Sequence, residues 1–284
     1  AAMDLVGNPS SVHAEGRAAK ALIGRARAQV AAALGAEGAD VIFTSGATEA
    51  AALALSGREI ACAGVEHDAV SAWCRNDLAV DGWGRVAVPD PARAALQLAN
   101  SETGVVQVLP EGLALSDLTQ GFGKVPFAFN WMGITAGIVS AHKLGGPKGI
   151  GALVVKRGTD VAALLRGGGQ EMGRRAGTEN LIGIAGFGAA AEAAARDLAN
   201  GVWDEVAEVR NILKEALEFP IKEVYFPGWE TSGDRPTPGG MPALLPNTLS
   251  VISPGWKGET QVMRMDLMGF AVSAGSACSS GKVR

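Results

Sequence analysis

Short apolar runs separated by polar or glycine-containing turns dominate the first 160 residues of the chain. An apolar run of this length between turn residues is typical of a buried strand. We therefore predict strands at residues 41–43, 59–63, 85–88, 94–99, 113–116, 136–140 and 151–156.

Longer patterns predict helices between and after these strands. Ser10 and Ser11 can cap an alanine-rich helix that stops near Gly35, and residues 49–55 have a second helical pattern. A tract from 182 to 217 has the pattern of one long helix. Strands that alternate with helices indicate an α/β fold with a mostly parallel sheet flanked by helices.

The pattern of apolar and turn-forming residues changes after this tract. Loops that contain Pro, Gly and Trp surround short apolar stretches at 224, 249–252 and 270–272. We therefore predict a large domain at residues 1–200 and a smaller α+β domain at residues 201–284.

Composition and charge give no sign of a nucleic-acid-binding or membrane protein. The 284 residues include 39 glycines, about twice the usual ~7%, as expected of many tight turns. A net charge of −4 gives no reason to expect nucleic acid or an anionic membrane as the main partner. The most apolar stretch, 181–191, ends at Glu192 and is too short to span a bilayer.

Three cysteines, Cys62, Cys74 and Cys278, are too few and too widely spaced for a disulfide framework or a zinc site. We expect no metal and a reducing cytoplasm. Cys62 and Cys74 lie in apolar runs and are interpreted as packing residues. Cys278 lies in a loop of small residues, which suits an accessible, reactive thiolate.

Candidate binding residues follow the predicted strands, where ligands gather in open α/β sheets. Thr44 to Thr48 joins a strand to a helix, so its backbone N–H groups form either an anion site or only a well-capped turn. Neither a dinucleotide fingerprint nor a phosphate loop with Gly-Lys-Ser/Thr occurs. Asp117 either shapes a turn or pairs with the protonated ring nitrogen of a pyridoxal.

A lysine with the chemistry of a cofactor anchor follows the strand at 136–140. Lys143 comes after Ser140 and His142 and can form a Schiff base with an aldehyde cofactor. Lys148 is the local competitor for this role, and we expect it to face solvent.

Taken together, these residues resemble the cysteine desulfurases of the aminotransferase class V superfamily, which have the type I pyridoxal-phosphate transferase fold. The resemblance extends from residue 8 almost to the last residue. It rests on Asn-Pro-Ser-Ser-Val-His at 8–13, Phe-Thr-Ser-Gly-Ala-Thr-Glu at 43–49, Glu-His at 66–67, Glu-Thr-Gly at 102–104, Ser-Ala-His-Lys at 140–143, Gly-Gly-Gly-Gln-Glu at 167–171, Arg-Ala-Gly-Thr at 175–178 and Gly-Ser-Ala-Cys at 275–278.

The resemblance implies pyridoxal 5'-phosphate as cofactor, L-cysteine as substrate and a sulfur-acceptor or scaffold protein as partner, with sulfur used for iron–sulfur clusters or related cofactors. It implies that Lys143 holds the cofactor, that His67 stacks on its ring and moves protons, and that Cys278 takes the substrate sulfur as a persulfide. The remaining implied cofactor contacts are Ala47, Thr48, Ser101, Asp117 to the ring nitrogen, Gln120 to the phenolic oxygen, Ser140, His142, and Thr178 from the second subunit of a homodimer.

The sequence departs from the family pattern at several places. Ser101 stands where the family has Asn, Met172 replaces an Arg, and residues 105–115 are too short for a crossover helix, so we expect a turn near Pro110. We expect the chain to be shortened at both ends, without the family's N-terminal segment or its Arg for the substrate carboxylate. A selenocysteine lyase or transaminase of the same superfamily, and a non-catalytic partner subunit, are the alternative functions.

Overall fold

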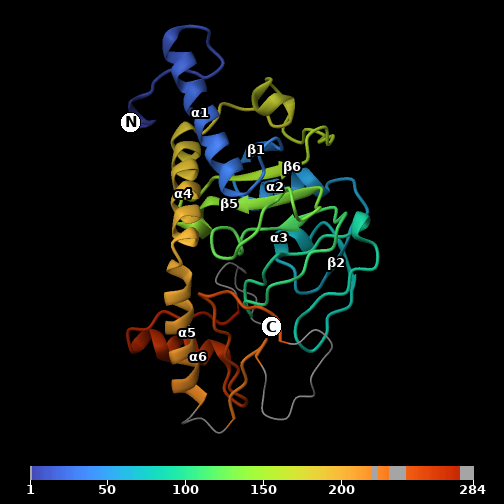
Figure 1. The fold of residues 1–284 in the computed structure, drawn as a ribbon, viewed down its shortest axis with the longest axis vertical. Helices are drawn as coiled ribbons and strands as arrows, with labels where there is room; N and C mark the ends of the chain where they lie inside the picture. Colours follow the sequence, from blue (N-terminus) through green and yellow to red (C-terminus); the bar gives the residue numbers. More distant parts are fainter. Residues whose placement is uncertain (1, 219–222, 230–240, 276–284) are drawn as a thin grey trace.

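The computed structural model describes residues 2–218, 223–229 and 241–275 (Figure 1). Its centre is a four-stranded sheet with the order β1-β6-β5-β4. These strands are β1 (Asp40–Thr44), β4 (Ser116–Asp117), β5 (Ala136–Ser140) and β6 (Gly151–Val155). A two-stranded sheet of β2 (Ala61–Ala63) and β3 (Arg75–Leu78) lies beyond β4.

The pairing is mixed, with two parallel and two antiparallel strand pairs among the described residues. β4 and β5 are parallel, as are β2 and β3, whereas β6 runs antiparallel to both of its neighbours. Isolated parallel bridges, Ala95 to Leu115 and Ala61 to Ala94, connect the two sheets through the stretch predicted as a strand at 94–99. The predicted α/β class is confirmed, and β6 is the exception to the parallel pattern.

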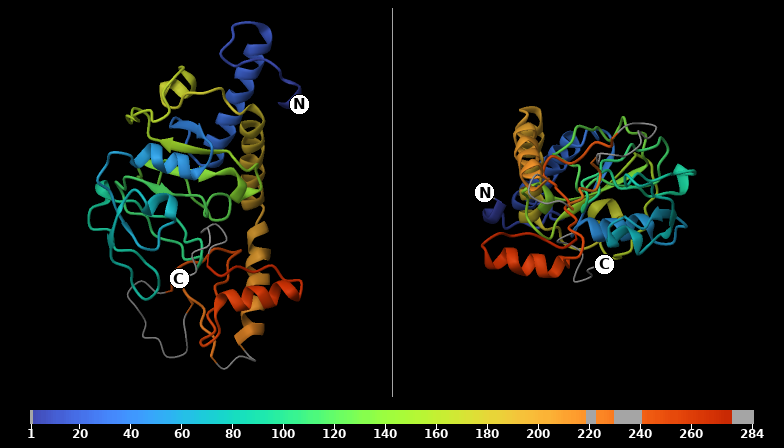
Figure 2. Two further views of the ribbon diagram at one scale, coloured as in Figure 1. Left: turned by 180° about the vertical axis from the view of Figure 1, so that it is seen from behind. Right: turned by 90° about the horizontal axis from the view of Figure 1, so that it is seen from below.

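Two layers of helices cover the sheet (Figures 1 and 2). On one face, α1 (Ala14–Ala33) packs against α4 (Leu181–Ala199) over Val139 and Val154. A Cβ on Gly188 would lie 2.8 Å from the Cα of Ala26, so this glycine permits the close approach of the two helices. On the other face, α2 (Ala47–Leu55) and α3 (Asp68–Ser71) cover Ile138 and Leu153.

The helix predictions are right in kind and wrong in two details. α1 ends at Ala33, just before Leu34 and the left-handed Gly35, as expected. Its N-terminal cap is His13, whose Nδ1 accepts the N–H of Gly16, rather than Ser10 or Ser11. The tract from 182 to 217 is two helices, α4 and α5 (Val202–Glu218), because Gly201 adopts a left-handed φ of 74° between them.

Several predicted strands are shorter than expected. The stretch at 59–63 contributes only β2, and 113–116 contributes only the start of β4. Residues 85–88 contain one isolated bridge instead of a strand, whereas β3 was not predicted because its residues are mostly polar and exposed. Residues 105–115 contain a turn at 111–112 and no helix, as expected from their length.

The segment after residue 201 lies beyond one end of the sheet (Figure 1). It contains α5, α6 (Gly258–Leu267) and an antiparallel bridge between Tyr225 and Ile252. The division into two domains at residue 200 stays a prediction. The described residues also contain four 3-10 turns, at Ala2–Asp4, Pro91–Arg93, Ala141–Leu144 and Gln170–Gly173. In the described part of the chain, no helix combines the length and apolar character needed to cross a membrane.

Candidate active site

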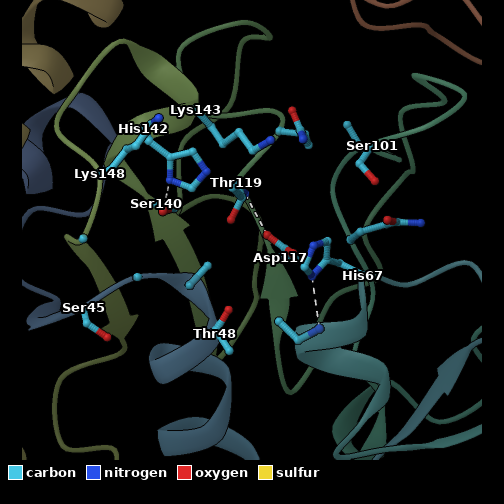
Figure 3. A pocket seen from close by; sticks show the side chains of 17 residues that line it. Ser45, Thr48, His67, Ser101, Asp117, Thr119, Ser140, His142, Lys143 and Lys148 are labelled. Atoms are coloured by element: carbon cyan, nitrogen blue, oxygen red, sulfur yellow. Dashed lines mark hydrogen bonds between the residues drawn. The ribbon is translucent and has the colours of Figure 1, made fainter. Parts of the chain in front are cut away.

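A cavity of about 630 Å³ opens where β4, β5 and α2 meet (Figure 3). β4 and β5 point their carboxyl ends at it, and α2 points its N-terminus at it. The lining side chains therefore come from segments far apart in the sequence. They are Ser45, Gly46, Ala47, Thr48, His67, Ala69, Gln97, Ala99, Ser101, Asp117, Thr119, Gln120, Ser140, His142, Lys143, Lys148 and Gly149.

The wall at the start of α2 is suited to an anion. Ser45 to Thr48 line the cavity at the N-terminus of α2. The first backbone N–H groups of a helix have no partner within the helix, so they attract negative charge at this end. Gly151 brings β6 close to this turn, because a Cβ there would lie 2.7 Å from the Cα of Gly46.

Two further polar groups stand opposite this turn. The Ser140 Oγ and the His142 Nδ1 lie 2.8 Å apart, which fixes both side chains at the end of β5. Burial lowers the pKa of His142, and the neighbouring charges of Lys143 and Lys148 lower it further. The imidazole is therefore neutral at neutral pH and can offer a hydrogen bond without carrying a charge.

Asp117 lies at the end of β4, next to His67 (Figure 3). Burial raises its pKa, while the N–H of Thr119 at 2.9 Å and the charges of His67 and Lys143 act in the opposite direction. A desolvated carboxylate in this position gains most from a cationic partner inside the cavity. The His67 Nδ1 accepts the N–H of Ala69 at 3.1 Å, which caps α3 and orients the ring beside Asp117.

Lys143 reaches the same cavity from the 3-10 turn Ala141–Leu144 that follows β5 (Figure 3). Gly145 ends this turn with a left-handed φ of 84°. Lys148 is exposed, as expected, but it also lines the cavity.

Glu66 and Gln97 support the wall around His67. The Glu66 carboxylate accepts the backbone N–H of Gln97 at 2.8 Å, and the Gln97 amide donates to the Val65 carbonyl at 3.0 Å. Burial raises the pKa of Glu66 well above its usual value, and its Oε2 has no hydrogen-bond partner. Burial therefore favours the protonated, uncharged form of this carboxyl group, which links the residue before His67 to Gln97.

The donor set fits pyridoxal 5'-phosphate. The cavity offers an amine at Lys143, a half-buried carboxylate at Asp117, an imidazole beside it and a helix N-terminus for the phosphate. Thr119 also lines the cavity with a buried hydroxyl beside Asp117, which can hydrogen-bond a bound ligand. This combination of an amine, a ring-nitrogen partner and an anion site is what a phosphorylated pyridine aldehyde needs.

Most of the predicted site residues line this one cavity. Thr178 is exposed and does not line it, and Cys278 lies outside the described residues. Sequence reasoning missed Gln97 and Thr119. Thr119 could have been predicted as a site residue, because it follows Asp117 by two residues where a strand ends. Gln97 could not, because the apolar run around it predicts a strand and no site.

Carboxylate–arginine pairs fix the segment 170–176 to the edge of the sheet. The Glu171 side chain is only 2% exposed and binds the Arg27 guanidinium at 2.7 and 2.8 Å and the Phe43 N–H at 2.9 Å. Glu171 and Met172 both have left-handed backbone, with φ of 48° and 61°, which non-glycine residues rarely adopt. The carboxylate thus covers the outer edge of β1 and holds a strained turn in place.

Comparison with known proteins gives a consistent result. The family model described as aminotransferase class V matches residues 2–79 and 87–283. A cysteine desulfurase of Klebsiella pneumoniae is 38% identical over 99% of this chain and 75% of its own length, and the cysteine desulfurase IscS of Dictyoglomus turgidum is 34% identical over 98% and 76%. The crystal structure of a NifS-like protein from Rickettsia africae superposes with a TM-score of 0.86, at 29% identity over 96% of this chain and 81% of that one.

Proposed function

The chain belongs to the aminotransferase class V family, and we propose that it is a pyridoxal-phosphate-dependent cysteine desulfurase that converts L-cysteine to L-alanine. The observation that carries the proposal is the meeting of Lys143 and Asp117 in one cavity beside the anion-binding turn of α2. Relatives named cysteine desulfurase, similar over nearly the whole chain, supply the reaction.

When bound, pyridoxal phosphate supplies an aldehyde that condenses with amines and a ring that withdraws electrons. In the proposed site, Lys143 would hold that aldehyde, and its amine, once released, would move a proton at the α-carbon of the substrate. Asp117 holds the ring nitrogen in its protonated form, for which a desolvated carboxylate is the suited partner. His67, Gln120 and Ser101 line the same cavity, where His67 would stack on the ring and the other two would contact its polar groups.

The phosphate is assigned to Ala47, Thr48, Ser140 and His142. The neutral imidazole of His142 donates to the phosphate through the nitrogen that does not face Ser140. We propose that Thr178, which is exposed here, completes the phosphate site of a second subunit in a homodimer.

The sulfur transfer is assigned to Cys278. Its thiolate attacks the sulfur of the bound cysteine, a new S–S bond forms, and the C–S bond of the substrate breaks. The carbon takes a proton and leaves as alanine. The net reaction converts cysteine and one protein thiol to alanine and one protein persulfide, so no external oxidant or reductant is consumed. We propose that an acceptor or scaffold protein in the cytoplasm takes this sulfur for iron–sulfur cluster or related cofactor synthesis.

Lys148 provides a matched control for the cofactor lysine, because it lines the same cavity five residues away. We expect added pyridoxal phosphate to give a protein-bound visible absorption band in the wild type and in Lys148→Ala, and none in Lys143→Ala. A band that survives in Lys143→Ala and is lost in Lys148→Ala would contradict the assignment. Loss of sulfide production in Cys278→Ala, with the band kept, separates a desulfurase from a transaminase, which needs no thiol.

A further inference from the structure

Two neighbouring arginines fix the same segment to different parts of the fold. Arg174 donates to the Asp40 carboxylate, at the start of β1, at 2.8 Å. Arg175 donates to the Glu49 carboxylate, in the first turn of α2, at 2.8 and 3.4 Å. The two pairs are equally buried, with side-chain exposures of 20% and 19% in one and 23% and 20% in the other. The two ion pairs therefore differ in the element that they bind, β1 or α2, and not in burial.

Glu49 is directly linked to the anion-binding turn. Its Oε2 accepts the backbone N–H of Ser45 at 2.7 Å, and Ser45 lines the cavity. This bond resembles a capping box and orders the chain from Ser45 to Thr48. The same bond places the Glu49 carboxylate directly beside the turn assigned to the phosphate. Without a compensating cation, its negative charge would repel the phosphate dianion.

Glu49 keeps its charge in this position. Burial acts to raise its pKa, but hydrogen bonds from Arg175 and Ser45 and the charge of Arg175 outweigh burial and hold the pKa below the usual value. Glu49 in turn raises the pKa of Arg175. The two groups are therefore an ion pair with no net charge, and Arg175 is the cation that compensates Glu49.

We propose that Arg175 is a positioning residue for the cofactor phosphate, because it lets Glu49 order the Ser45 to Thr48 turn without repelling a dianion there. The neutral Glu49–Arg175 pair thereby preserves the turn's selection of the phosphorylated aldehyde over free pyridoxal. This inference rests on the proposed function, in which the phosphate occupies that turn. No such selection comes from the neighbouring Arg174–Asp40 pair, since Asp40 does not contact the turn.

The test is the ratio of the dissociation constants of pyridoxal and pyridoxal phosphate, measured by absorbance titration of the full-length apoprotein. We expect Arg175→Gln to lower this ratio about tenfold or more, because an uncompensated carboxylate repels only the phosphorylated ligand. The double variant Glu49→Gln with Arg175→Gln should restore the ratio to within about threefold of the wild type. The uncharged amide that Glu49→Gln introduces can still accept the Ser45 N–H through its oxygen.

Arg174→Gln is the matched control and should leave the ratio unchanged. If Arg175→Gln does not fold, Arg175→Lys keeps the positive charge and should keep the wild-type ratio. Equal effects of Arg174→Gln and Arg175→Gln, or no rescue in the double variant, would show that Arg175 only holds the loop. A wild-type protein that binds neither aldehyde at Lys143 would instead overturn the proposed function itself, and that outcome appears before any variant is made.

Discussion

Glu171 is the residue whose removal should cost the fold the most among the charged side chains described above. Its carboxylate makes three hydrogen bonds, two to Arg27 and one to the Phe43 N–H, and is almost completely buried. Replacing it with alanine leaves the Arg27 cation without its carboxylate partner and the buried Phe43 N–H unsatisfied.

The expected magnitude follows from these contacts. Breaking a buried ion pair from one side costs about 3–5 kcal/mol, and an orphaned buried donor costs about 1–3 kcal/mol. Arg27 remains 27% exposed, so water compensates part of its lost partner. We therefore expect Glu171→Ala to lower the free energy of unfolding by about 3 kcal/mol. Glu171→Gln, which keeps one acceptor, should cost about half as much.

Urea unfolding of the apoprotein measures both variants. The control is Glu59→Ala, which removes the carboxylate of an exposed pair: Glu59 and Arg93 lie 2.7 Å apart, with side chains 81% and 56% exposed. Such a pair contributes at most about 1 kcal/mol. A loss in Glu171→Ala no larger than in Glu59→Ala would refute the argument that burial and the Phe43 bond give Glu171 its weight.

Two further predictions concern Asp117, which lines the cavity, and Glu66, which supports the wall behind His67. Asp117→Asn should weaken pyridoxal-phosphate binding about tenfold or more, since a charge-assisted hydrogen bond to the ring nitrogen is lost; an unchanged affinity in an absorbance titration would contradict its role. Glu66→Gln should raise the free energy of unfolding at pH 8 and have less effect at pH 5. The reason is that the folded state keeps a proton on Glu66 that the unfolded state releases above its ordinary pKa, so stability falls as pH rises through that range. A variant that is equally destabilised at both pH values would show that Glu66 is ionised in the folded protein.

The fold was predictable where burial alone decides the structure. β1, β5 and β6 are apolar on both faces, so their runs of Val, Ile, Leu and Ala mark them without ambiguity. β3 could not be found in this way, because its residues Arg75 to Leu78 gain their place by pairing with β2 rather than by burial. The break between α4 and α5 depends on one glycine, Gly201, which the helical pattern on either side concealed.

The site was predictable where chemistry follows a strand, as for Asp117 and Lys143. The residues that support it were harder to find because their partners are distant in sequence. Glu49 and Arg175 are 126 positions apart, and Arg27 and Glu171 are 144 apart, so only the folded chain reveals each pair. His13 as the cap of α1 was missed for a different reason: two serines nearby have a stronger general preference for that position.

The most direct test of the proposed reaction is the yield of alanine and sulfide from protein loaded with pyridoxal phosphate and given L-cysteine and a thiol reductant. We expect the wild type to form alanine and sulfide in equal amounts and Cys278→Ala to form neither while keeping its bound cofactor. Sulfide with pyruvate in place of alanine, or full activity in Cys278→Ala, would contradict persulfide transfer through that cysteine.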